Sequence, residues 1–246
     1  MLSKKITSKT APIIVQFTIC ILFLSFTFLV FQQNQFIKNK DLGFEKDNLV
    51  MIWQPHMEDW WNMNSMMRTF DIDAKKHASI IDVTKARGNP GGYGYGMKGM
   101  VSNEKTGFDN GQQFVYNSVI YNWFEVFGMK LLAGKYYTKD SENDIIINYS
   151  ACKKLGYTDP NQIIGTEIQV EDRVKNKKVI GVTEDVNFKS LKFKTEPVIF
   201  LLEKGDLIIP AVVKLDPEGF RDGLEYLEKV WKKVFPNNDF VYTDFS

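Results

Sequence analysis

One uncharged run near the N-terminus constrains this chain more than any other feature. Residues 11–31 contain no Asp, Glu, Lys or Arg and consist mainly of Ile, Leu, Phe and Val. A helix rises about 1.5 Å per residue, so this run is about 30 Å long as a helix, the thickness of the hydrocarbon core of a bilayer. Pro12 stands near its start, where a helix tolerates proline.

Three interpretations of the run compete: a buried helix of a soluble protein, a cleaved signal peptide and an uncleaved membrane anchor. A soluble helix usually keeps a polar face. A signal peptide has an apolar core of about 7–15 residues and ends in a small-residue cleavage site. This run is longer and continues into Gln32, Gln33 and Asn34. The sequence therefore favours a transmembrane helix over residues 11–31.

The lysines predict how this helix is oriented. Lys4, Lys5 and Lys9 precede it, and the next lysine is Lys38. The positive-inside rule then places residues 1–10 in the cytoplasm of a bacterium. We expect a chain in the inner (cell) membrane whose main domain is periplasmic or otherwise extracytoplasmic.

Charge and composition exclude several classes of protein. The chain has 31 Lys+Arg against 30 Asp+Glu, and 44% of its residues are hydrophobic. These proportions are those of a globular protein, and near-neutrality argues against a nucleic-acid binder. Two cysteines and two histidines, without CxxC or HExxH, predict neither a disulfide framework nor a metal site. We expect no cofactor.

The outer part begins and ends with similar patterns. Residues 48–54 and 80–86 read as strands that flank an amphipathic helix over 59–77. Near the C-terminus, a strand over 208–215 is followed by a helix that Asp216, Pro217 and Glu218 predict to start there, and by a last strand from Phe240. The sequence thus predicts an α+β fold with two strand–helix–strand units.

A β-rich insert separates the two units. We expect residues 32–43 to form a helical stalk, 44–94 and 205–246 to form one α+β subdomain, and 95–204 to form a β-rich subdomain. Within the insert, strands alternate with turns, one of them expected at 173–177, and Asn148 or Ser150 is placed to cap a helix that Gly156 closes.

Glycines near residue 90 raise the question of a phosphate site. Six of the twelve residues from Gly88 to Gly99 are glycine, and residues 94–99 match GxGxxG. A dinucleotide fingerprint must open a helix, but residues 100–103 read as a strand and a turn. Gly134-Lys135 is also no Walker A loop, since Gly128 lies one residue too far upstream. We therefore interpret the glycines as a turning connector.

Four stretches resemble the extracytoplasmic core domain of MacB/FtsX-type ABC transporter permeases. The first is the helix end NKDLGF; the others are similar to the family segments FGMKLLAGR, VIINEAAAKKLG and VIGVVKDFHFKSL. In this chain they span residues 39–44, 121–134, 145–156 and 179–191.

The resemblance implies a two-part periplasmic module, with a porter-like part at 44–94 and 205–246 and a sabre-like part at 95–204. It also implies a cytoplasmic ABC ATPase partner, further transmembrane helices and a homodimer. The domain would relay ATPase-driven motion for export or mechanotransmission, and would not be an enzyme. Family permeases have at least three more helices after this domain, so a sequence that stops at Ser246 predicts a fragment or a truncated permease.

Two other functions remain open from sequence. A membrane-anchored ligand-binding or sensor domain would use the loop between Gly88 and Gly99 and would need no ATPase. An anchored hydrolase would need a catalytic group. Carboxylate pairs such as Glu184 and Asp185 are typical of solvated surface, and Ser118 lacks a G-x-S-x-G context. We predict no catalytic residue.

The tryptophan pair of the first soluble helix suggests a docking surface. Trp60, Met63 and Met67 share one helical stripe, typical of core packing, whereas Trp61 falls off it. We hypothesise that Trp61 lies exposed beside Tyr93 and Tyr95 and forms with them a partner-docking patch.

Overall fold

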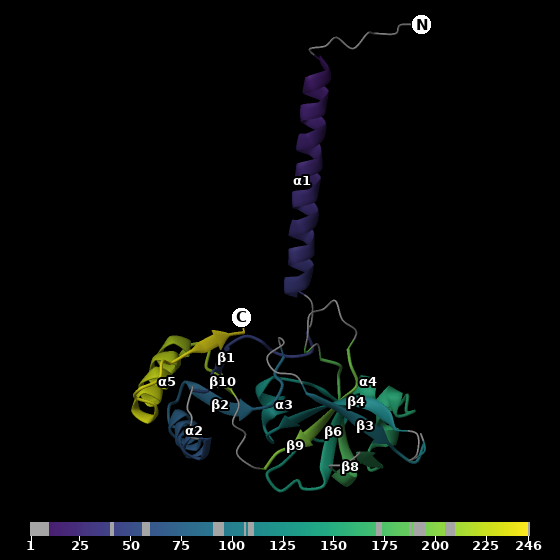
Figure 1. Ribbon diagram of the computed structural model, residues 1–246, viewed down its shortest axis with the longest axis vertical. Coiled ribbons are helices and arrows are strands. Elements are labelled where there is room, and N and C mark those ends of the chain that lie inside the picture. Colours follow the sequence, from purple (N-terminus) through teal and green to yellow (C-terminus); the bar gives the residue numbers. More distant parts are fainter. Residues whose placement is uncertain are drawn as a thin grey trace. The chain divides into compact units, whose positions relative to one another are not determined.

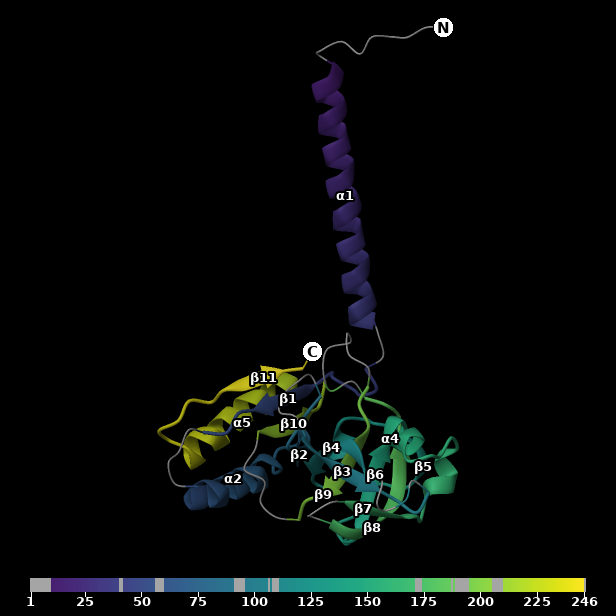
Figure 2. The same ribbon diagram turned by 45° about the vertical axis from the view of Figure 1, so that its right-hand side comes forward.

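The computed structural model describes residues 10–39, 42–55, 60–90, 96–105, 107, 111–170, 174–186, 188, 195–204 and 210–245. It divides into two compact units, Met1–Asp41 and Leu42–Ser246, each of which has its own architecture. Most elements of both are labelled in Figure 1, and β5, β7 and β11 are labelled in Figure 2.

The first unit is a single long helix. Helix α1 covers Thr10–Asn39, and Ala11–Gln35 is long and apolar enough to cross a membrane. The hydroxyl groups of Thr18 and Thr27 donate to the carbonyl oxygens of Ile14 and Phe23 at 2.9 and 2.8 Å. These polar side chains are therefore satisfied within the helix, as a lipid environment requires. The predicted apolar N-terminal helix is confirmed and continues beyond residue 31.

The second unit begins and ends in a four-stranded antiparallel sheet. Its strands are β1 (Leu49–Ile52), β2 (Ile80–Lys85), β10 (Ala211–Leu215) and β11 (Tyr242–Asp244), in the order β11-β1-β10-β2. Strand β10 lies between β1 and β2, and β1 lies between β10 and β11. The two strand–helix–strand units thus interlock in a ferredoxin-like arrangement.

Helices α2 (Trp60–Ala74) and α5 (Phe220–Val234) pack side by side on one face of this sheet (Figures 1 and 2). Strand β1 is buried throughout, because its side chains alternate between the two faces of the sheet. Val50 and Ile52 join the core under the helices, whereas Leu49 and Met51 join a second core on the helix-free face. The helix-side core also contains Met63, Met67, Phe70, Leu227, Trp231 and Phe235.

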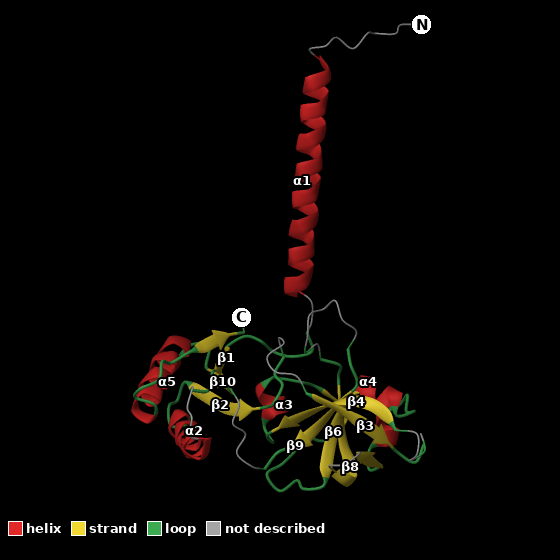
Figure 3. Ribbon diagram, viewed as in Figure 1, coloured by secondary structure: helices red, strands yellow, loops and turns green. Residues whose placement is uncertain are grey.

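The second sheet is mixed and contains the remaining described strands, which fan out as yellow arrows in Figure 3. These are β3 (Met97–Ser102), β4 (Gln112–Val119), β5 (Leu131–Gly134), β6 (Asp144–Asn148), β7 (Glu167–Val170), β8 (Val174–Thr183) and β9 (Val198–Leu202). Their order is β5-β8-β6-β9-β4-β3-β7, and β7 also pairs with β8. The pairings therefore close a circuit of six described strands, with β5 added on the outside of β8.

Inside this circuit lies a third core, which α4 (Tyr149–Lys154) and the short 3₁₀ turn η1 (Pro160–Ile163) help to close. Its fully buried members include Ile145, Ile147, Cys152, Leu155, Val179 and Ile199. The α+β fold predicted from sequence, an apolar helix followed by a β-rich domain, is confirmed.

Two local predictions were wrong. The turn expected at 173–177 is strand from Val174 onward, because Val174 pairs with Val170 of β7. Helix α5 begins at Phe220, not at Pro217. The Asp216 carboxylate accepts from the Glu218 N–H at 3.0 Å and closes a turn just before the helix. The predicted cap at Asn148 is confirmed, since its side chain accepts from Ala151 N–H at 2.9 Å.

Candidate functional site: the junction between the two sheets

The most concentrated structural feature of the second unit is an aromatic cluster around the one-turn helix α3 (Trp123–Val126). Trp123 is fully buried, and its ring lies 5.1 to 5.9 Å from four phenylalanine rings. These rings come from α3, the turn after it, the loop after β8, and β9: Phe124, Phe127, Phe188 and Phe200. The segment that resembles FGMKLLAGR thus forms the centre of a core.

This core joins the two sheets. Leu49, Met51 and Val212, from the helix-free face of the first sheet, belong to the same cluster as Trp123 and as Phe200 of the second sheet. Strand β2 also continues directly into the junction, since Ala86 bridges Val119 and the Arg87 N–H donates to the Ser118 carbonyl at 2.9 Å. Apolar burial of this kind makes the two sheets one packed body rather than two loosely tethered ones.

A polar contact lines the same junction. The amide nitrogen of Asn122 donates to the Asp82 carboxylate at 2.6 Å and to the Val83 carbonyl at 3.1 Å. The ammonium of Lys75 lies 2.6 Å from the same carboxylate. Burial opposes ionisation of Asp82, but the hydrogen bonds from Lys75 and Asn122 outweigh it and lower the pKa of this carboxyl group. Asp82 therefore fastens the edge of β2 to the start of α3.

The first residues of the glycine-rich stretch form hydrogen bonds within the junction. Gly88 and Asn117 exchange two hydrogen bonds, of 2.8 Å and 2.7 Å. The indole N–H of Trp123 donates to the Asn89 side chain at 3.2 Å. Residues 97–102 then form strand β3, not a helix, so the GxGxxG spacing does not open a helix N-terminus. The interpretation of this stretch as a connector fits these contacts.

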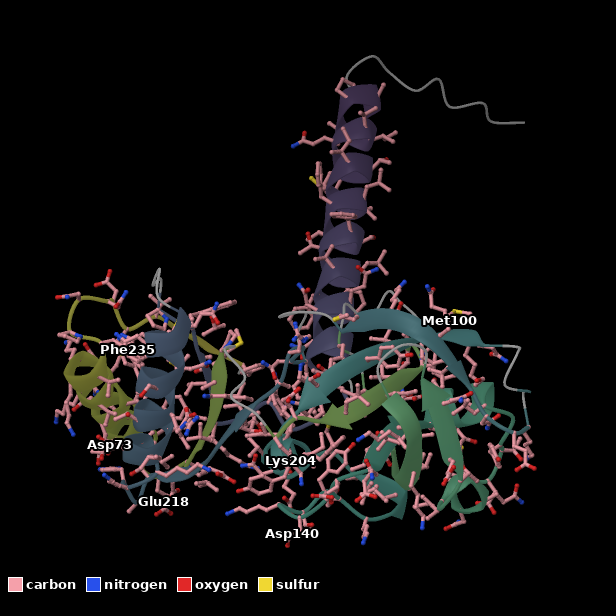
Figure 4. The ribbon with its side chains drawn as sticks, turned by 60° about the horizontal axis from the view of Figure 1, so that its bottom comes forward. Asp73, Met100, Asp140, Lys204, Glu218 and Phe235 are labelled. Carbon is pink, nitrogen blue, oxygen red and sulfur yellow. The ribbon has the colours of Figure 1, made fainter. Side chains whose placement is uncertain are left out.

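Two glycines, Gly96 just before β3 and Gly99 within it, allow this segment to lie close to β4. A Cβ atom on Gly96 would come within 1.9 Å of the Tyr116 carbonyl oxygen, and one on Gly99 within 2.4 Å of the Tyr116 ring. Their role is thus close packing. Figure 4 labels Met100, an exposed residue of the same strand.

The other resembling segments also have structural roles. Asp185, after β8, accepts from the Ser150 N–H and hydroxyl at 2.8 and 2.7 Å, which holds the start of α4. The Asn148 side chain caps α4 and also accepts from the Val198 N–H at 2.9 Å. Of the carboxylate pair Glu184 and Asp185, Asp185 therefore has a structural role, because it accepts hydrogen bonds at the start of α4.

The hypothesised docking patch cannot be placed. Tyr93 and Tyr95 lie outside the described residues, as does the side chain of Trp61. On the same helix, Met63 and Met67 are buried in the helix-side core. Asp73, near the end of this helix (Figure 4), pairs with Lys76 and Lys233, and the hydrogen bond from Lys76, followed by that from Lys233, lowers the pKa of Asp73. The ion pair with Lys233 links α2 to α5.

No group of three or more His, Cys, Asp or Glu side chains able to hold a metal ion occurs among the residues that the structure describes. The residues of the junction were only partly visible in the sequence. Asn122 and Trp123 lie in a segment that the family resemblance marked, but nothing marked Asn89, which accepts from the Trp123 indole, or Asn117, which bonds Gly88.

The structure defines a class by its fold: an α+β domain preceded by an apolar helix, with the fold of periplasmic and extracellular domains of ABC-type transporters. The structure is similar to the periplasmic region of MacB from Actinobacillus actinomycetemcomitans, with 17% identity and a TM-score of 0.55 over 82% of this chain and 91% of that one. The resemblance to a MacB-like core domain is thereby confirmed at the level of the fold.

Two further solved structures agree. The extracellular domain of the noncanonic ABC-type transporter YknZ from Gram-positive bacteria matches with 9% identity and a TM-score of 0.53, over 80% of this chain and 98% of that one. A domain assigned to a permease protein from Porphyromonas gingivalis matches with 12% identity and a TM-score of 0.54, over 82% and 93% of the two chains. No family model matches the sequence, and no curated protein matches it.

Proposed function

We propose that this chain is the extracytoplasmic part of a MacB/FtsX-type permease, anchored by α1, and that it relays ATPase-driven motion across the membrane. The observation that carries the proposal is the shared core around Trp123, which packs the first sheet against the second. A relay needs its parts to move as a packed body, because closely packed interiors transmit displacement while loose linkers absorb it. The likeness of the fold to permease domains supports the same function.

The proposal includes a division of labour within the second unit. Residues 44–94 and 205–246 would form the porter-like part and residues 95–204 the sabre-like part. It also includes a cytoplasmic ABC ATPase, further transmembrane helices and a homodimer as partners. The patch of Trp61, Tyr93 and Tyr95 is proposed as a docking point for a partner outside the membrane.

Partner capture tests the function. The tagged chain is expressed in its own bacterium, cross-linked in membranes, purified and analysed by mass spectrometry. We expect an ABC ATPase to be recovered with it, and to be lost when residues 10–39 are replaced by an unrelated membrane-spanning helix. Recovery of a bound small molecule without any ATPase would favour the anchored sensor instead.

Orientation is tested by labelling. A membrane-impermeant maleimide should modify Asp47→Cys in intact cells, because the residue is exposed in the second unit. It should modify Ser3→Cys only after lysis, since residues 1–10 are proposed to be cytoplasmic. The reverse pattern would refute the proposed topology.

A further inference from the structure

The two ends of the second unit meet on one side chain. The ring of Phe44, which follows α1 in the chain, lies 6.0 Å from that of Phe127 in an edge-to-face contact. The ring of Phe245, just after β11, lies 5.8 Å from Phe127 in a second edge-to-face contact. We call Phe44, Phe127 and Phe245, with the ion pair of Glu45 and Lys214 described next, the Phe127 latch.

Polar contacts reinforce the N-terminal arm of the latch. The Glu45 N–H donates to the Phe127 carbonyl at 2.8 Å. The Glu45 carboxylate lies 2.9 Å from the Lys214 ammonium on β10. A Cβ atom on Gly128 would come within 2.5 Å of the Glu45 side chain, so only glycine, with its φ of +58°, lets the segment approach this closely.

The C-terminal arm is fixed to strand β1. The Phe245 N–H donates to the Leu49 carbonyl at 3.1 Å, and Leu49 is buried in the junction core. Phe127 itself is fully buried and lies 5.3 Å from Trp123. Both ends of the unit thus reach the centre of the junction through one aromatic ring.

The latch determines how much of a displacement at Leu42 reaches the folded part of the second unit. Without it, residues 42–48 would be a seven-residue tether able to extend over about 23–25 Å, which would absorb movement as slack. With Phe44 and Glu45 held on Phe127, just after α3, only Leu42 and Gly43 of this segment precede the fixed point. Gly43 also packs closely, since its Cβ position is 2.7 Å from the Asp185 carbonyl oxygen.

We infer that the Phe127 latch is the mechanical input of the domain: displacement of the chain where it leaves α1 moves α3 and the junction before it moves β1. This inference rests on the proposed function and adds to it the residues that take up the movement. It requires the two arms to be coupled through Phe127, and this coupling is testable on the purified chain alone.

The test is hydrogen exchange of the full chain in lipid nanodiscs, without nucleotide or partner. Phe44→Ala should accelerate exchange of the Phe245 amide, and Phe245→Ala that of the Glu45 amide, each about fivefold, as expected for losing ~1 kcal/mol of local stability. The matched control is Phe220→Ala, which truncates a half-buried phenylalanine of the helix-side core. Phe220→Ala should not accelerate exchange of the Glu45 or Phe245 amide more than it accelerates exchange of neighbouring amides.

The outcomes separate coupling from simple loss of packing. If each truncation accelerates only amides of its own arm, or if Phe220→Ala gives the same pattern, the inference is wrong. If the truncations loosen the whole unit, Glu45→Gln decides, because it removes the ion pair but keeps the shape of the segment. Glu45→Gln should accelerate exchange of the backbone amides of residues 45 and 245 about twofold. Asp47→Asn should leave the exchange of both amides unchanged. Unchanged exchange of both amides in Glu45→Gln would overturn the latch.

Failure here and failure of the proposed function are distinguishable. Exchange is measured without an ATPase, whereas the function is tested by capturing one. If the exchange experiment shows no coupling between the two arms but the chain still captures an ABC ATPase, the proposed function stands. Only the inference about the Phe127 latch is then wrong.

Discussion

Replacing Trp123 by alanine tests whether the junction holds the second unit together. A buried aromatic side chain removes about 150–250 Å² from water, which at about 25 cal/mol/Å² corresponds to roughly 4–6 kcal/mol. Alanine keeps part of this burial, and measured large-to-small losses for Phe or Trp are about 3–5 kcal/mol. The variant also leaves the side-chain oxygen Oδ1 of Asn89 without the indole N–H that donates to it at 3.2 Å. This unsatisfied acceptor costs about 1–3 kcal/mol. We expect a total destabilisation of about 5 kcal/mol.

Urea denaturation of the full chain in detergent, followed by near-ultraviolet circular dichroism, measures this loss. With an m value of about 2.5 kcal/mol/M, the midpoint should fall by about 2 M. Trp231→Ala is the matched control, because Trp231 is also fully buried and donates one hydrogen bond, of 3.1 Å, to the Asn238 carbonyl, but lies on the helix side of the first sheet.

Both variants should shift one common transition if the two sheets unfold as a single body. A Trp123→Ala midpoint within about 0.2 M of the wild type would refute the reasoning, since it would mean that the junction core contributes less than ~0.5 kcal/mol. Two separate transitions, only one of them sensitive to Trp123→Ala, would show that the sheets are independent domains.

Three further predictions concern single positions. Gly134→Ala should lower the free energy of unfolding by at least about 2 kcal/mol, because its φ is +82° and the new Cβ would lie 2.0 Å from the Ile180 carbonyl oxygen; Gly165→Ala, with φ +87° but only a 3.6 Å neighbour, should cost less in the same urea titration. The folded-state pKa of Asp82 is lowered, so its stabilising contribution is complete above its ordinary value of 3.8 and is lost as pH falls below it; Asp82→Asn should flatten the acid limb of stability against pH, and an unchanged limb would contradict this. Burial raises the pKa of the Cys152 thiol to about 11, so in a Cys20→Ser chain at pH 8 Ellman's reagent should react only after unfolding, and rapid reaction of that chain in its native state would contradict the burial of Cys152.

Much of the fold was predictable from local patterns. Helix α5 shows helical periodicity of its apolar residues, with Leu227, Trp231 and Val234 buried. Strands β1 and β2 fall within the predicted ranges 48–54 and 80–86. Such elements depend on periodicity and capping, which are properties of neighbouring residues. Boundaries set by other strands were missed, as at Val174, where pairing with β7 extends β8 into an expected turn.

The candidate site was harder to predict from the sequence than the fold. The sequence marked the segment around Trp123 by resemblance, yet its partners Asn89 and Phe200 lie 34 and 77 residues away in the chain. No local pattern records such a contact, because it arises only when two sheets pack. The hypothesis for Trp61 stays a prediction.

The sequence by itself determined that residues 11–31 form an apolar helix, that α+β units occur at both ends of the second unit, and that the sequence has no CxxC or HExxH motif. These properties follow from composition, periodicity and spacing, which act along the chain. Only the tertiary structure decided that Phe44 and Phe245 meet on Phe127 and that Asp82 fastens β2 to α3. Residues distant in sequence become neighbours through burial of shared apolar surface, and that surface exists only once the strands have paired.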